Sequence, residues 1–176
     1  MWVGTSVPYL TPRTGDQADA WSEEAATTGQ TGTQKLREVT EAMPPQDVAA
    51  ALGLSPGETA VVRRRVMFFD DQPVELTDSW YPAAVASGTA LGEPRKIKGG
   101  AVTLLAELGY VAHEAREEIE CRPATADEAT ELKLTPGAPV IALTRTTLTA
   151  DEVPFEVSVM TMVAAGRRLR YRLVVE

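Results

Sequence analysis

The sequence predicts an α+β fold, in which helices pack on one antiparallel sheet. The stretches 54–79 and 134–159 read almost alike, so one structural unit occurs twice. Each stretch contains two runs of β-branched and aromatic residues joined by a short polar turn, which is the pattern of a β-hairpin. Strands joined by hairpins run antiparallel, whereas parallel strands need long crossover connections.

The spacing of identical residues defines the repeat. After a shift of 80 positions, Asp47, Ala49, Leu52, Leu54, Pro56, Gly57 and Arg65 recur as Asp127, Ala129, Leu132, Leu134, Pro136, Gly137 and Arg145. After the hairpin turns the shift becomes 81, since Pro73 and Glu75 recur as Pro154 and Glu156. Two copies of a helix–turn–hairpin unit are too few for a solenoid, and they suit one pseudo-symmetric sheet.

The other elements follow from periodicity, caps and turn residues. Residues 34–43 have a spacing that suits either a strand or a helix, and both remain open. The second repeat helix begins with a capping box formed by Thr125 and Glu128. We further expect a short helix ending at Gly53, strands over 60–69 and 73–81, a helix over 101–109, a charged strand over 114–124, a hairpin over 140–163 and a half-buried antiparallel strand over 167–176.

The N-terminal residues differ in composition from the rest of the chain. They are rich in Thr, Gly, Pro, Ser and Ala, and only the stretch DAWSEEAATTG has a helical pattern. We therefore predict a partly ordered arm or linker over 1–43 and a domain over 44–176. In the alternative interpretation, Trp2, Tyr9 and Trp21 pin the arm onto the domain or onto a partner subunit, because large aromatics have little use in a disordered arm.

Composition narrows the class of function. The formal net charge of −8 opposes binding to DNA by this chain alone, because DNA affinity depends largely on cationic contacts with phosphates. The single cysteine, Cys121, and the single histidine, His113, argue against a disulfide, a metal site and covalent hydrolase chemistry. No apolar run reaches the roughly 20 residues that cross a membrane. We expect a cytoplasmic protein without a metal or cofactor.

The first hairpin carries a concentration of polar residues. A three-residue turn over 70–72 would pair Phe69 with Pro73, Met67 with Glu75, Arg65 with Thr77 and Arg63 with Ser79. Because alternate residues of a strand share a face, this register gathers Arg63, Arg65, Glu75, Thr77 and Ser79 on one side. The set is either a solvated surface with a cross-strand ion pair, or a pocket whose guanidinium groups bind a carboxylate or phosphate.

Six stretches follow one another in a characteristic order and spacing: VRRRV, PVELTDSWYP, KGGAVTLLAELGY, EEIECRPATADEA, PGAPVIALTR and VPFEVS. In this order they resemble the UTRA domain, the effector-binding half of the HutC subfamily of GntR transcription regulators. The resemblance extends from about Pro45 to Glu176. It implies a fold similar to chorismate lyase, and a homodimer. A full regulator also has an N-terminal winged helix-turn-helix, which this sequence lacks; VGTSVPYLTP and DAWSEEA resemble the segment that follows it.

The resemblance also implies the ligand-binding residues. In the family, two arginines of the first strand and the glutamate twelve positions after the first of them hold the effector. The predicted set here is Arg63, Arg65, Glu75, Thr77, Ser79, Gly100, Glu156 and Ser158. Val102 and Met162 stand where the phosphosugar-binding members have polar residues, so we expect a less polar pocket and disfavour a phosphosugar. The arginines favour an anionic or carboxylate-bearing effector.

Three functions remain open. The first is an effector-binding and dimerisation domain of a GntR/HutC-type regulator, or a free-standing relative of one. The second is a chorismate-lyase-like lyase or isomerase without a metal or covalent nucleophile. In it, Arg63 or Arg65 anchors a carboxylate, while Glu75 or Glu156 is the acid/base. The third is an interaction protein that pairs with a full-length regulator.

Overall fold

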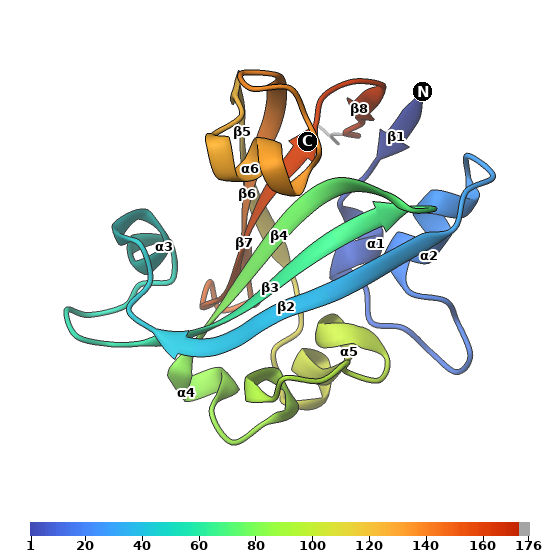
Figure 1. Cartoon of the computed structure of the whole chain (residues 1–176). Helices are drawn as coiled ribbons and strands as arrows, with labels where there is room; N and C mark the ends of the chain where they lie inside the picture. The colour runs from blue at the N-terminus through green and yellow to red at the C-terminus, as the bar shows by residue number, and fades with distance from the viewer. Residues whose placement is uncertain (173–176) are drawn as a thin grey trace.

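The computed structural model describes residues 1–172, and its centre is a six-stranded sheet (Figure 1). Every neighbouring pair of strands in this sheet is antiparallel. The predicted α+β fold is confirmed. In spatial order the strands are β2 (Gly32–Ala42), β3 (Ala60–Phe69), β4 (Gln72–Pro82), β7 (Pro154–Val163), β6 (Pro139–Leu148) and β5 (Glu114–Pro123).

Short helices connect or flank these strands. The longest begins at Gly100, and the second repeat helix carries the predicted capping box between Thr125 and Glu128. Figure 1 shows α4 below the end of β2 and α5 farther back along the same side, with α1 and α2 near the beginning of β2. The helices are α1 (Val7–Leu10), α2 (Ala20–Ala26), α3 (Gln46–Ala51), α4 (Ala83–Ala86), α5 (Gly100–Glu107) and α6 (Ala126–Glu131), with a 3-10 turn at Ala90–Gly92.

The two copies of the repeat lie side by side. The first comprises α3, β3 and β4, and the second α6, β6 and β7. Their last strands, β4 and β7, pair at the centre of the sheet, where Ser79 lies opposite Ser158. Apolar residues of both copies are buried against the sheet, including Val48 and Trp80 from the first and Leu132 and Val140 from the second. The duplication therefore produces one continuous sheet with its axis of pseudo-symmetry between the two central strands.

The turn of the first hairpin is tighter than predicted. Asp70 and Asp71 alone connect the strands, and Phe69 pairs with Gln72 instead of Pro73. A bulge then restores the register, because Met67 pairs with Glu75 as expected. The same pairing continues with Arg65 opposite Thr77 and Arg63 opposite Ser79, as predicted. Asp70 has a φ of 51°, a conformation that Asp tolerates better than most residues.

Both ends of the chain lie differently from the predicted arrangement. Residues 32–42, placed within the predicted arm, form the edge strand β2, so the sheet begins before residue 44. The predicted final strand over 167–176 is wrong for the described residues. Only β8 (Arg167–Leu169) is extended, and it pairs in parallel with β1 (Trp2–Gly4) in a separate two-stranded sheet. Residues 173–176 of the predicted strand lie outside the described residues.

Candidate functional site

A cavity of about 150 Å³ lies between the sheet and the residues that precede it. We call residues 1–29 the N-terminal segment. The floor comes from β3, β4, β6 and β7, and the side from the beginning of α5. The N-terminal segment supplies the opposite wall, through residues of β1, α1 and α2. This wall is fixed by an aromatic cluster of Trp2, Trp21 and Phe69, whose ring centroids lie 4.2–5.6 Å apart.

A chain of hydrogen bonds crosses the middle of the floor. Arg65 Nη2 donates to the hydroxyl of Ser79 at 2.8 Å, and the hydroxyls of Ser79 and Ser158 lie 3.0 Å apart. Ser158 donates its proton to Glu156 at 2.7 Å. Because a hydroxyl has only one proton, Ser79 is the donor to Ser158. All four side chains are thereby oriented, while Arg65 Nε is buried and has no hydrogen-bond partner among the described residues.

A second charged cluster lies at one end of the floor, around Glu75. Thr77 donates to Glu75 Oε1 at 2.9 Å, and Glu75 Oε2 is 2.9 Å from Arg167 Nη1. The guanidinium of Arg167 lies over the ring of Trp2, 3.6 Å from its centroid. Its Nη2 is 3.8 Å from Glu24 Oε1 of α2. Arg167 thus contacts the sheet and the N-terminal segment at the same time.

The two glutamates of the repeat are far apart along the sheet. Glu75 lies opposite Met162, and Trp80 lies opposite Val157, so Glu156 falls next to Tyr81 at the other end of the face. Along β4, Glu75 and Tyr81 are six residues apart, which corresponds to roughly 20 Å at the rise of a β-strand. The two carboxylates therefore serve different ends of the floor.

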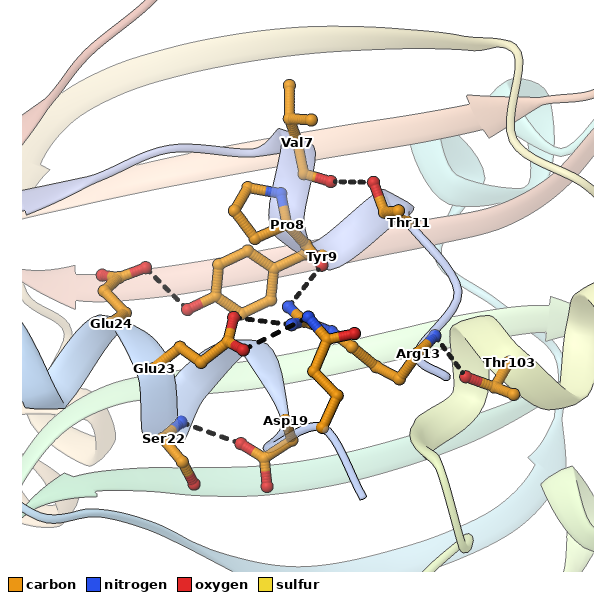
Figure 2. Close-up of polar contacts among 11 residues, drawn as sticks. Val7, Pro8, Tyr9, Thr11, Arg13, Asp19, Ser22, Glu23, Glu24 and Thr103 are labelled. Carbon is orange, nitrogen blue, oxygen red and sulfur yellow. Dashed lines mark hydrogen bonds and ion pairs between the residues drawn. The ribbon is translucent and has the colours of Figure 1, made fainter. Parts of the chain in front are cut away.

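Polar contacts hold the N-terminal segment together (Figure 2). The hydroxyl of Tyr9 donates to Glu24 at 2.7 Å, and the indole N–H of Trp2 donates to the same carboxylate. Burial raises the pKa of Glu24, although these donors and Arg167 oppose the shift. Arg13 pairs with Glu23 at 2.6 Å, and its backbone N–H donates to Thr103 of α5 at 3.0 Å.

Most of the predicted ligand-binding residues lie around the cavity. Arg65, Glu75, Thr77, Gly100, Glu156 and Ser158 line it. Ser79 is fully buried and supports Arg65 and Ser158 from within the sheet. Val102 and Met162, expected to make the pocket less polar, line the cavity as well. The strand register therefore places predicted residues of both copies along the floor of the same cavity.

Arg63 has a different position from the one expected. Its guanidinium donates to the backbone carbonyls of Leu91 and Glu93, both at 2.8 Å, and of Arg95 at 2.7 Å. Its side chain is buried, and burial lowers its pKa. Arg63 lies beside a neighbouring cleft instead of the cavity, and its donors are occupied by the loop that precedes α5. Its evident task is to hold that loop.

Several residues around the cavity escaped the sequence prediction. They come from segments whose position depends on tertiary pairing, and the sequence indicated only the aromatic residues of the arm, Tyr9 and Trp21. These residues are Tyr9, Glu24, Arg145 and Arg167, together with Trp21 and Tyr171. Within residues 1–172, no group of three or more metal-ligating side chains is present, and no helix is long and apolar enough to span a membrane.

The N-terminal segment touches the sheet at Gly32. A Cβ atom at this position would lie 2.7 Å from the carbonyl oxygen of Trp21 and 2.9 Å from the Cβ of Ala25. Real Cβ atoms do not approach a backbone oxygen so closely, so a side chain here would push α2 away from β2. Because Gly32 has no side chain, α2 packs directly against β2. This contact sets the distance between the wall and the floor of the cavity.

The sequence of this chain is similar to those of a protein family and of two transcriptional regulators. The UTRA domain family model matches residues 27–165. An HTH-type transcriptional regulator of Streptomyces coelicolor is 35% identical over 127 residues, which cover 70% of this chain and 46% of the relative. An HTH-type transcriptional regulator of Mycobacterium tuberculosis is 36% identical over 121 residues, covering 65% and 42%. The chain thus spans less than half of the length of these relatives.

The fold agrees with solved structures as well. The effector domain of PhnF from Mycobacterium smegmatis superposes with a TM-score of 0.75 at 18% identity, covering 89% of this chain and 95% of that domain. At this identity the likeness shows the fold alone. The family match includes all six strands of the sheet completely, so it covers the whole floor of the cavity. The chain belongs to the UTRA domain family of GntR-type transcription regulators.

Proposed function

We propose that this domain binds a small-molecule effector in the cavity and thereby regulates a GntR-type transcription regulator of the HutC subfamily in the cytoplasm. The observation that carries the proposal is the Arg65–Ser79–Ser158–Glu156 chain. It crosses the cavity floor and combines a cation with an anion in a largely buried place. A folded protein rarely retains such groups without use, because burying them costs free energy.

The chain of hydrogen bonds suggests which ligand groups fit. Arg65 can bind an anionic oxygen, since a guanidinium carries five donors and, among residues 1–172, only its Nη2 bond to Ser79 is made. Glu156 can accept a hydrogen bond from a hydroxyl or amine of the ligand. The first turn of α5 also lines the cavity, and its N–H groups after Gly100 can donate to an anion, whereas the N–H of Gly100 donates to Ile97. An effector with a carboxylate or another anionic group is supported by these residues.

Ligand binding is tested by thermal unfolding against a panel of small carboxylates, phosphates and hydroxy acids. A compound at about 100 times its Kd stabilises the folded state by about 2.7 kcal/mol, which is a shift of roughly 5–10 °C for a chain of this size. Arg65→Met should abolish the shift caused by the stabilising compound. Arg64→Met is the matched control, because Arg64 is exposed on the other face of the same strand.

The result against the proposal is equally clear. If Arg65→Met and wild type respond alike to the stabilising compound, the compound binds elsewhere and the cavity is not the effector site. Native mass spectrometry of the purified chain supplies an independent measurement. A small molecule retained by the wild type and by Arg64→Met should be absent from Arg65→Met.

Dimerisation is the second part of the proposal. Regulators that bind symmetric DNA sites use two-fold assemblies, and an effector acts by favouring one arrangement of the pair. We expect a homodimer in native mass spectrometry at micromolar concentration. With a net charge of −8, the chain alone should give no specific DNA complex at physiological salt. A monomer at all concentrations, or a specific DNA shift, would contradict this part.

A further inference from the structure

Arg167, near the C-terminal end of the described chain, touches the floor of the cavity and the N-terminal segment at the same time. Its guanidinium lies 2.9 Å from Glu75 on the floor and 3.8 Å from Glu24 on α2. The Trp2 ring of β1 covers one face of it at 3.6 Å. Only 4% of its side chain is exposed. A guanidinium between two carboxylates and an aromatic face is a strong local attachment when water is excluded.

Several polar atoms of this attachment have no hydrogen-bond partner among residues 1–172. Nε and Nη1 of Arg167 and Oε2 of Glu75 are buried and make no hydrogen bond of good geometry with any of residues 1–172. The ion pair with Glu75 therefore acts mainly through charge. Such a cluster is sensitive to changes around it, since each buried polar group without a partner carries a desolvation cost. A small movement of either wall alters its stability.

We propose that Arg167 is a positioning residue that fastens the N-terminal segment over the cavity and so couples occupancy of the cavity to the docking of that segment. The fastening is a property of the ligand-free chain. The coupling rests on the proposed function, because it requires the cavity to be the effector site.

The coupling follows from linkage. The N-terminal segment supplies one wall and the sheet the other, so a ligand that contacts both walls binds the docked form more tightly than the undocked form. Its binding free energy then adds to that of the Arg167 contacts. Effector binding would thereby be transmitted to β1 and to any chain that continues from it.

Arg13 provides a direct assay for docking. It is the only lysine or arginine in residues 1–34, so trypsin can cut this part of the chain only there. In the docked segment its side chain is 7% exposed, is paired with Glu23 and lies beside Thr103 (Figure 2). Cleavage after Arg13 therefore requires the segment to open, and its rate follows the open population when opening is fast.

The first experiment compares Arg167→Gln with Arg168→Gln. We expect release of the 1–13 peptide, measured by mass spectrometry, to become at least about tenfold faster in Arg167→Gln. Arg168→Gln removes one cationic side chain and one trypsin site from the neighbouring exposed position, and should change the rate less than about twofold. Equal rates in wild type and Arg167→Gln would overturn the proposal.

The second experiment separates fastening from general unfolding. Arg167→Ala leaves a space that matches ethylguanidinium, which is the part of arginine that the substitution removes. At a few millimolar, well below denaturing concentrations, ethylguanidinium should slow cleavage at Arg13 in Arg167→Ala by at least about threefold. It should leave Arg168→Ala unaffected. Absence of rescue in a variant with a wild-type far-UV circular dichroism spectrum would count against the fastening role.

Neither experiment requires the effector. If the trypsin and rescue results hold while Arg65→Met leaves the ligand response unchanged, the fastening stands and the effector site is wrong. If Arg65→Met removes the ligand response while Arg167→Gln leaves cleavage unchanged, the effector site stands and the fastening is wrong.

Discussion

The two copies of the repeat use equivalent residues in opposite ways. Arg65 and Arg145 occupy equivalent positions, as do Glu75 and Glu156. In the first copy the glutamate is paired, with Arg167, while the arginine faces the cavity. In the second copy the arginine is paired, with Glu117 at 2.6 Å, while the glutamate makes no ion pair among the described residues. Among the described residues, the first copy thus leaves its cation without an ion-pair partner at the cavity, and the second copy leaves its anion without one.

The difference arises from the neighbours of each hairpin. β6 is followed in the sheet by β5, which brings Glu117 directly opposite Arg145. Ser6 of the N-terminal segment also accepts from Arg145, at 2.9 Å. On the other side β2 brings Leu36 opposite Arg65, and an aliphatic side chain offers no acceptor. A duplicated unit therefore acquires two roles without any change in its own strand pattern.

Removing the arginines should separate these roles most clearly. Arg145→Met leaves Glu117 as a buried carboxylate without its cation and should lower the free energy of unfolding by about 3–5 kcal/mol. Arg65→Met should cost about 1 kcal/mol or less, because Nη2 makes one hydrogen bond and Nε makes none. Urea unfolding at pH 7 measures both. Equal losses in the free energy of unfolding would mean that Arg65 stabilises the fold as much as Arg145 does.

The glutamates should show the reverse order. Glu75→Gln removes one of the two carboxylates near the buried Arg167 and should cost about 2–3 kcal/mol. Glu156→Gln keeps an acceptor for Ser158 and should cost less than about 1 kcal/mol, while it weakens the response to the stabilising compound. Thermal unfolding with and without that compound distinguishes the two. A larger loss in Glu156→Gln would contradict the proposed division of labour.

The repeat helices differ in their response to acid. Arg122 holds the pKa of Glu128 at about 2, with help from the capping contacts of α6. The equivalent position in α3 is Val48, which has no charge to lose. Because the folded-state pKa lies below the ordinary value of 4.5, the stabilisation is complete above about pH 5 and is lost as the pH falls toward 2. Glu128→Gln should cost about 1–2 kcal/mol at pH 7.

The measurement is the difference between wild type and Glu128→Gln in urea midpoint, taken from pH 7 downward. We expect this difference to shrink steadily below pH 4.5. A difference that stays constant down to pH 2.5 would show that the substitution acts through packing and that the carboxylate charge contributes nothing.

Arg64 should show the smallest effect. It lies between Arg63 and Arg65, is exposed, and faces Glu38 and Asp78 at 3.4 and 3.7 Å. Exposed ion pairs contribute little, so Arg64→Gln should change the free energy of unfolding by less than about 0.5 kcal/mol. A loss above 1 kcal/mol in urea unfolding would show that this face of the first hairpin is covered in solution.

The fold was predictable because the repeat encodes it locally. Hairpin patterns, caps and the 80-residue offset define the four central strands and their register, and with them the positions of Arg65, Glu75 and Glu156. The position of Arg63 could not be deduced. Its four hydrogen bonds go to carbonyls of the loop at 90–95, and backbone acceptors leave no trace in a side-chain pattern.

The position of the N-terminal segment, which forms the wall of the cavity, could not be predicted from the sequence for another reason. It depends on the parallel pairing of β1 with β8, which are more than 160 residues apart and only three residues long. Strands this short have no periodicity to detect. The three aromatic residues of the arm were the one available signal, and Trp2 and Trp21 are indeed buried against Phe69. The charged partners, Glu24 and Arg167, can be recognised only after those rings are placed.

The close contact at Gly32 bears on how such a pocket can change its size. No atom of Gly32 lines the principal cavity, yet the residue sets the height of the wall above the floor. A single methyl group there would act as a wedge beneath α2 and enlarge the space for ligand without altering any residue that lines it. Under the proposed function, the size of effector that fits the cavity is thus adjustable from the edge strand, at a position that does not line the cavity.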